Sequence, residues 1–252
     1  MTKTRAPAAL SLPLGLLVAL TGCSAQDRAT DPAEVRELAG STQARHSREG
    51  AEAHLRSVVR AYDEETPLTL GLVSLDDTCA GGTAADWLSS SEDDRYKIRC
   101  TLRVSAYYGA DPKRIAQALD GVFSAGDREA AAGDGAAGTV PFGHDDYRTR
   151  LVAYYAGRGP NPTGPDTPEP VQVSDPSQTL SWDTARSDPP TRAEEPGPPA
   201  AGGPPLSRHL REPASTTVAD VRARHGMVFR LELSSVDYYS VSKDGRTVQD
   251  WE

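Results

Sequence analysis

Residues 96–106, YKIRCTLRVSA, alternate apolar with polar side chains more regularly than any other part of the chain. The apolar set, from Tyr96 through Cys100 to Ala106, points to one side of an extended backbone, and the basic or hydroxylated residues between them point to the other. This pattern is typical of an antiparallel sheet with one buried face and one face in water. The sequence therefore predicts a fold organised around such a sheet.

Further strands are predicted where apolar residues recur with the same period of two. Asp244-Gly245 is a strong signal for a hairpin turn between the last two of them. Residues 76–94 separate the first strand from residues 96–106 and are expected to form a loop. The additional predicted strands are residues 67–73, 147–155, 227–233, 236–241 and 246–251.

Helices are predicted where apolar residues recur three and four positions apart. The strongest case places Leu55, Val58, Val59 and Tyr62 on one stripe. Other helices begin with capping signals, such as an aspartate before a proline or a threonine three residues before an aspartate. The predicted helices are residues 31–40, 47–63, 111–123 and 217–225, and residues 124–138, rich in glycine and alanine, are expected to form a mobile loop.

These elements predict an α+β fold with one antiparallel sheet of about five strands and helices packed on one face. Residues 46–156 would form the core of the fold, and residues 214–252 would complete its sheet. A separate C-terminal domain is the alternative, although a segment of that length rarely folds by itself without disulfides or a structural metal ion.

Residues 157–213 differ in composition from the rest of the chain. Fourteen of these residues are prolines and few are large and apolar, so the segment buries little surface to offset its ordering entropy. The sequence predicts a mostly disordered linker here. Residues 171–173 and 179–182 are the exception, because they could form a short edge hairpin that docks on the core.

The N-terminus has the three parts of a secretory signal. Lys3 and Arg5 are basic, residues 8–20 are apolar, and Leu20-Thr21-Gly22-Cys23 follows directly. The last four residues resemble the lipobox of bacterial lipoproteins. The resemblance implies cleavage after Gly22, a diacylglycerol and further acylation on Cys23, and attachment to the extracytoplasmic face of the cell membrane. An ordinary secreted protein with an incidental cysteine is the alternative.

This reading divides the chain into a signal peptide of residues 1–22, a tether of residues 23–45 and the segments defined above. The excess of arginine over lysine resembles the amino-acid bias of high-GC Gram-positive bacteria. Without Lys3 and Arg5, 25 basic and 36 acidic residues remain, which gives a net charge of −11. A net negative charge disfavours binding to nucleic acid and to anionic lipid headgroups, because both attract positive charge. The protein is therefore expected to reach the membrane through its lipid alone.

Two cysteines remain if Cys23 is acylated. Cys79 and Cys100 form an even pair, and outside the cytoplasm such a pair can persist as a disulfide. Closing a loop of this length would stabilise the fold by roughly 3 kcal/mol in the chain-entropy model. Two buried free thiols are the alternative.

Metal-ligating residue types gather at two places. His144, Asp145 and Asp146 are weak candidates for a metal site or for acid-base chemistry, but adjacent residues of an extended segment point to opposite faces, so the three cannot easily converge on one ion. The three neighbouring acids Glu92-Asp93-Asp94 could bind a hard cation such as calcium, although their spacing does not match that of an EF-hand loop. A polar loop is the favoured interpretation of both, so no metal and no cofactor are expected.

Three function classes fit these observations. The favoured one is a non-catalytic surface lipoprotein that binds an unknown envelope protein or ligand. An extracytoplasmic hydrolase is the alternative, but the chain lacks the G-x-S-x-G and H-E-x-x-H motifs, and no catalytic residue is assigned. The substrate-binding lipoprotein of a transporter is less favoured, because that class needs two α/β lobes with parallel sheets.

Overall fold

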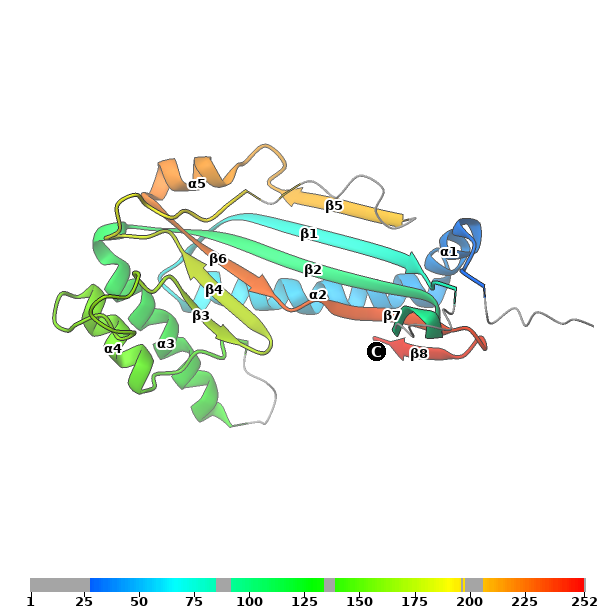
Figure 1. Ribbon diagram of the computed structural model, residues 1–252, viewed down its shortest axis with the longest axis horizontal. Coiled ribbons are helices and arrows are strands. Elements are labelled where there is room, and N and C mark those ends of the chain that lie inside the picture. Colours follow the sequence, from blue (N-terminus) through cyan, green and yellow to red (C-terminus); the bar gives the residue numbers. More distant parts are fainter. Residues whose placement is uncertain (1–27, 85–91, 134–138, 196, 198–205, 252) are drawn as a thin grey trace, which may run out of the picture.

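The computed structural model describes residues 28–84, 92–133, 139–195, 197 and 206–251. These residues form an α+β fold with one large, open antiparallel sheet (Figure 1). The strands are β1 (Thr69–Gly81), β2 (Tyr96–Ala110), β3 (Gln172–Asp175), β4 (Gln178–Trp182), β5 (Leu206–Glu212), β6 (Met227–Leu233), β7 (Val236–Ser242) and β8 (Thr247–Asp250).

The long strand β2 lies at the centre of the sheet. It pairs with β1 along one edge, and along the other edge it pairs first with β7 and then with β6. The sheet continues from β1 to β5, from β6 through β4 to β3, and from β7 to β8. The C-terminal strands therefore extend the same sheet that β1 and β2 begin.

Five α-helices accompany the sheet, with short 3-10 turns at Glu92–Arg95 and Pro112–Arg114. Side chains of Asp31, Ser41, Asp145 and Thr217 accept hydrogen bonds from backbone N–H groups at the starts of four helices, as N-caps do. The helices are α1 (Pro32–Ala39), α2 (Thr42–Glu65), α3 (Ile115–Ala132), α4 (Asp146–Tyr155) and α5 (Val218–His225).

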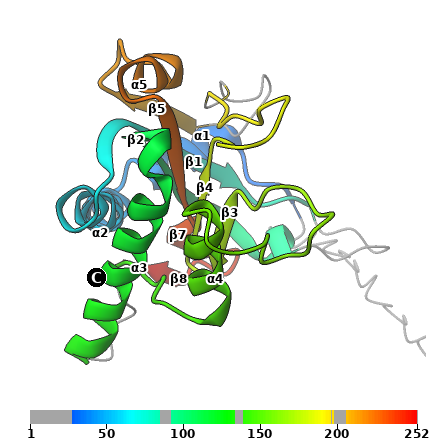
Figure 2. The ribbon, with the colours of Figure 1, turned by 90° about the vertical axis from the view of Figure 1, so that its left-hand side faces the viewer.

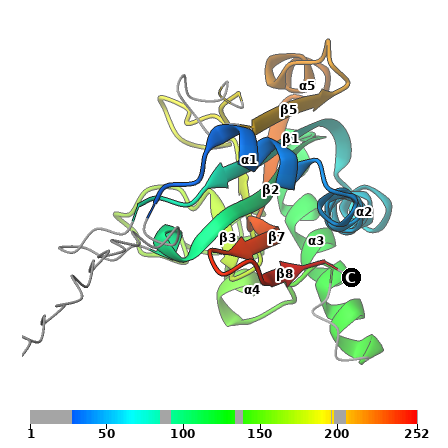
Figure 3. The same ribbon diagram turned by 90° about the vertical axis from the view of Figure 1, so that its right-hand side faces the viewer.

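The main core lies between one face of the sheet and helices α1 to α4. The predicted helix stripe of Leu55, Val58, Val59 and Tyr62 is buried there. The inward residues of β2 and β6 meet it, so the predicted alternation of both strands is confirmed. Figure 1 shows α2 running along the sheet, and Figure 3 shows α1 at one end of β1 and β2.

Helix α5 covers the opposite face of the sheet, which corrects the prediction of helices on one face (Figure 2). Val218 and Val221 of α5 pack there on Leu72, Tyr107 and Val228. Leu72 and Tyr107 have neighbours that belong to the main core, and successive strand residues point to opposite faces. The sheet is therefore apolar on both faces beneath α5.

The sheet contains eight strands, rather than about five. Strand β1 is longer than predicted, because it continues to Gly81, through the first part of the predicted loop, and pairs with β2 up to Ile98. The additional strands come from residues 157–213, which contribute three. β3 and β4 form the hairpin suggested by the sequence, and β5 pairs with β1.

The prediction of a mostly disordered Pro-rich linker is wrong for residues 157–195. Glu169 is only 8 % exposed, and its carboxylate accepts hydrogen bonds from the backbone N–H groups of Ala185, Arg186 and Ser187. Trp182 is buried and donates a hydrogen bond to Tyr155. A few buried polar anchors therefore order a segment that has little apolar surface, and residues 198–205 lie outside the described residues.

Three other local predictions are corrected. Residues 147–155 belong to helix α4 rather than a strand, because Asp145 caps the helix and Leu151, Val152 and Tyr155 fall on one buried face. Helix α3 continues to Ala132, beyond the predicted end at residue 123. In the predicted tether, α1 buries Val35 and Ala39 and is part of the fold.

Candidate functional site

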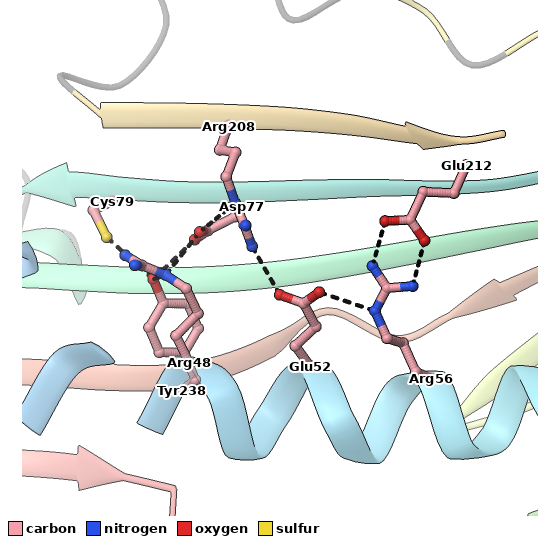
Figure 4. Close-up of polar contacts among 8 residues, drawn as sticks. All are labelled: Arg48, Glu52, Arg56, Asp77, Cys79, Arg208, Glu212 and Tyr238. Carbon is pink, nitrogen blue, oxygen red and sulfur yellow. Dashed lines mark hydrogen bonds and ion pairs between the residues drawn. The ribbon is translucent and has the colours of Figure 1, made fainter. Parts of the chain in front are cut away.

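A row of charged side chains on α2 faces β1 and β5. Arg48, Glu52 and Arg56 are spaced four residues apart, so they share one side of the helix. Arg208 and Glu212 of β5, together with Asp77 of the neighbouring strand β1, point toward this side of α2 (Figure 4). We call these six residues the charge network.

Asp77 is the buried end of the charge network, with a side chain only 3 % exposed. Its carboxylate lies 2.9 Å from Nε of Arg48 and 3.5 Å from Nε of Arg208. It also accepts a hydrogen bond of 2.8 Å from the hydroxyl of Tyr238, which belongs to β7. A buried carboxylate is costly unless it is paired and hydrogen-bonded, and Asp77 has both kinds of partner.

The charge network continues toward the other end of β5. Arg208 donates to Glu52 at 2.8 Å, and Arg56 donates to the other oxygen of Glu52 at 2.9 Å. Arg56 also forms a bidentate pair with Glu212, with N–O distances of 2.6 and 3.0 Å. Three arginines therefore meet three carboxylates, and the formal charges balance.

The contacts of the charge network alter the pKa values of its acids. Burial by itself would raise the pKa of Glu52, but hydrogen bonds from Arg208 and Arg56 outweigh it and lower that pKa. The hydrogen bonds from Arg56 lower the pKa of Glu212. Burial next to Asp77 raises the pKa of Tyr238, so its hydroxyl stays protonated and can donate.

A disulfide lies beside the charge network. Cys79 and Cys100 occupy directly opposite positions of β1 and β2, with Cα atoms 4.1 Å apart and an S–S bond between them. Both residues are fully buried. The Sγ atom of Cys79 is 3.4 Å from the hydroxyl of Tyr238, so the bridge packs against the buried end of the charge network.

An apolar groove opens where the charge network ends. It has a volume of about 400 Å³ and lies between α2, β1 and the end of β5. Val59, Val73, Leu70 and Pro213 supply its apolar surface, and Arg56, Arg60 and Glu212 supply its charged groups. Sites for small molecules usually combine an apolar concave surface with a few placed polar groups, and their volumes are roughly 300 to 1,000 Å³. The groove has this character.

The structure separates the weak metal candidates at residues 144–146. His144 binds Asp127 through Nδ1 at 2.6 Å, whereas Asp145 caps α4 and Asp146 pairs with Arg150. Within the described residues, no group of three His, Cys, Asp or Glu side chains is placed to hold a metal ion. In the second acidic run, Asp93 pairs with Arg99 and Asp94 accepts from Thr83.

One further sequence motif bears on the hydrolase alternative. Ser240-Val241-Ser242-Lys243 fits the pattern S-x-x-K, in which a lysine can activate a serine. Ser240 is 2 % exposed on β7, while Lys243 directs its ammonium group to the backbone oxygen of Thr83. The two side chains do not act as a pair here, so the match is fortuitous.

The lipidation candidate Cys23 and the apolar residues 8–20 lie outside the described residues. Within the part of the chain that is described, no helix is both long and apolar enough to cross a bilayer. The charge network and the groove were not predicted from the sequence. The spacing of Arg48, Glu52 and Arg56 on a predicted helix was the available signal for one side of the network.

No protein-family model, no curated protein and no solved structure matches the chain. The chemistry of the charge network and the groove therefore has to carry any functional conclusion.

Proposed function

We propose that this chain is a membrane-anchored lipoprotein of the extracytoplasmic face, where it acts as a non-catalytic binding module of the cell envelope. The anchor is the lipid on Cys23. The ligand site is the apolar groove between α2, β1 and β5. The groove is the single observation that carries the binding function, because it combines apolar surface with charged groups in one concave region.

Two features support the location. Leu20-Thr21-Gly22-Cys23 follows an apolar segment that is too short to span a bilayer, which requires about 20 residues. Cys79 and Cys100 form a buried disulfide, and such bonds persist in oxidising compartments outside the cytoplasm.

The charge network supports binding over hydrolysis. Asp77, Glu52 and Glu212 each bind at least one arginine, so none of these carboxylates is held as a free general base. The single antiparallel sheet also differs from the two parallel-sheet lobes that a transporter's substrate-binding lipoprotein needs. These observations leave the binding module as the function that the site supports best.

The anchor is tested by replacing its attachment point. Cys23→Ser removes the thiol that would be acylated, and the variant is expected to lose its diacylglycerol mass and its partition into the detergent-rich phase of a Triton X-114 separation. Full retention of the lipid mass in the variant would contradict the anchor.

The binding function is tested by native mass spectrometry of protein isolated from its own membranes. Wild-type protein is expected to carry a small molecule, and Leu70→Trp, which fills the groove, is expected to lose it. Leu210→Trp is the matched control, because Leu210 is also partly buried on the same side of the sheet but does not line the groove. An empty wild-type protein, or equal occupancy in Leu70→Trp, would reject this function for the groove.

A further inference from the structure

The charged groups that line the groove are not all paired. Arg56 and Glu212 form a bidentate pair on one wall. Arg60 lies one helical turn further along α2, is exposed, and has no ion pair with any described residue. The groove lining therefore contains two arginines and one carboxylate. Two further carboxylates contact the lining from outside, since Glu52 accepts from Arg56 and Asp63 accepts from the backbone N–H of Leu70 at 2.7 Å.

The apolar part of the groove is continuous with the core. Val59 and Val73 are 2 % and 7 % exposed and belong to the main core, while Leu70 packs against it and Pro213 follows the end of β5. An apolar ligand over these residues would lose contact with water on the side that faces the groove, and each methylene group that is fully buried there would contribute roughly 0.8 kcal/mol.

From these two features we infer that the groove binds a single-chain amphiphile with an anionic carboxylate head, such as a free fatty acid. This inference rests on the proposed function and names its ligand class. The acyl chain lies on Val59, Leu70 and Val73, and the carboxylate binds the guanidinium of Arg60. A volume of about 400 Å³ is near the lower end of small-molecule sites, which favours one chain over the two chains of a phospholipid.

The pairing of Arg56 explains why Arg60 is the head-group ligand. Arg56 already binds both oxygens of Glu212 and one oxygen of Glu52. A ligand that recruited Arg56 would have to displace these bonds, whereas Arg60 has no ion pair with a described residue to break. A guanidinium also binds a carboxylate through two parallel N–H groups, which an alcohol head group cannot match.

The test uses residues 23–252 with Cys23→Ser, which keeps every described helix and strand but removes the acyl chains of the anchor. Dodecanoate, dodecanol and dodecyltrimethylammonium are titrated below their micellar concentrations by isothermal calorimetry. Dodecanoate is expected to bind at least tenfold more tightly than dodecanol, and the cation more weakly still. Equal affinities for the acid and the alcohol would overturn the assignment of an anionic head group.

Variants separate the two parts of the site. Arg60→Gln is expected to lower the affinity for dodecanoate about tenfold and leave that for dodecanol unchanged, whereas Arg60→Lys retains most of the preference. Leu70→Trp is expected to abolish binding of all three probes, with Leu210→Trp unchanged. A preference for dodecanoate that survives in Arg60→Gln would overturn the role of Arg60, and thermal unfolding checks that each variant is folded.

The proposed function and this inference fail in different ways. If no acyl probe binds while protein from native membranes still carries a molecule that Leu70→Trp removes, the groove is a binding site for another ligand class and the fatty-acid inference is wrong. If native protein carries nothing and no probe binds, both conclusions fail.

Discussion

Arg48 and Asp77 form an ion pair in which Nε and Oδ2 are 2.9 Å apart and the carboxylate is only 3 % exposed. The pair joins helix α2 to strand β1 and lies beside the Cys79–Cys100 disulfide. At the other end of the charge network, the pair of Arg56 with Glu212 is much more exposed, since 51 % of the Glu212 side chain is accessible. The two ends of one network therefore differ in their surroundings, and this difference has measurable consequences.

Arg48→Met is expected to destabilise the protein by about 3 kcal/mol, because it leaves the buried carboxylate of Asp77 with less compensation. Arg56→Met is expected to cost no more than about 1 kcal/mol, since exposed pairs are screened by solvent. The free energy of unfolding in urea measures both. The double variant Arg48→Met/Asp77→Asn should recover part of the loss, and equal costs for the two single variants would contradict the importance of burial.

Two buried tyrosines provide a second comparison. The hydroxyl of Tyr238 donates to Asp77 and accepts from Arg48, so Tyr238→Phe is expected to cost about 1 to 3 kcal/mol. The hydroxyl of Tyr107 is buried without a hydrogen-bond partner among the described residues. Tyr107→Phe is therefore expected to be neutral or stabilising, as measured by the midpoint of thermal unfolding. A larger loss in Tyr107→Phe than in Tyr238→Phe would show that these polar contacts are misassigned.

The helix and strands that meet at the core were predictable because their patterns are local and one-sided. The stripe of α2, the alternation of β2 and the apolar row of β6 each require only a few neighbouring residues to recognise. Helix α4 was mistaken for a strand because Tyr147, Leu151, Val152 and Tyr155 fit either period over so short a segment. Its N-cap, Asp145, was the signal that distinguished the two.

Strand β5 and the charge network were hidden for a different reason. The strand reads LSRHLRE, and its charged side chains resemble those of a solvated linker. Its charges are matched by partners far away in the sequence: Arg208 binds Glu52, and His209 binds Asp76 at 2.6 Å. Such pairs stabilise a strand only after the sheet has formed, so no local pattern reveals them.

The lowered pKa values of Glu52 and Glu212 predict a dependence of stability on pH. A carboxyl group whose pKa is depressed by folding stabilises the protein above its unfolded pKa, near 4.3, and this contribution is lost as pH falls through the folded pKa. The free energy of unfolding is therefore expected to fall below about pH 4.

The variant Glu52→Gln isolates this effect. It should be less stable than wild-type protein at pH 6, and the difference should shrink as pH falls through the unfolded pKa near 4.3, because the unfolded carboxyl of the wild type then takes up a proton before the folded one does. Glu64→Gln is the control, since Glu64 is exposed and forms no ion pair with a described residue. A stability difference between Glu52→Gln and wild type that stays constant from pH 6 to pH 3 would contradict the assignment.

Removing residues 214–252 is expected to prevent folding of the rest of the chain. These residues contain β6 and β7, which occupy one whole edge of β2, and β4 reaches the sheet only through β6. Met227, Phe229, Leu231 and Leu233 are at most 5 % exposed. Each such side chain contributes roughly 1.5 to 3 kcal/mol on burial, and a whole domain is stable by only about 5 to 15 kcal/mol.

The truncated chain, residues 23–213, should therefore aggregate, because β2 exposes both its free edge and the apolar surface that β6 covers. Co-expression of residues 23–213 with residues 214–252 should restore a soluble complex, because the paired strands need no covalent connection once they are in register. Size-exclusion chromatography and urea unfolding measure both outcomes. A soluble, monomeric and cooperatively unfolding fragment of residues 23–213 would instead show that β6 and β7 are dispensable for the folding of the rest of the chain.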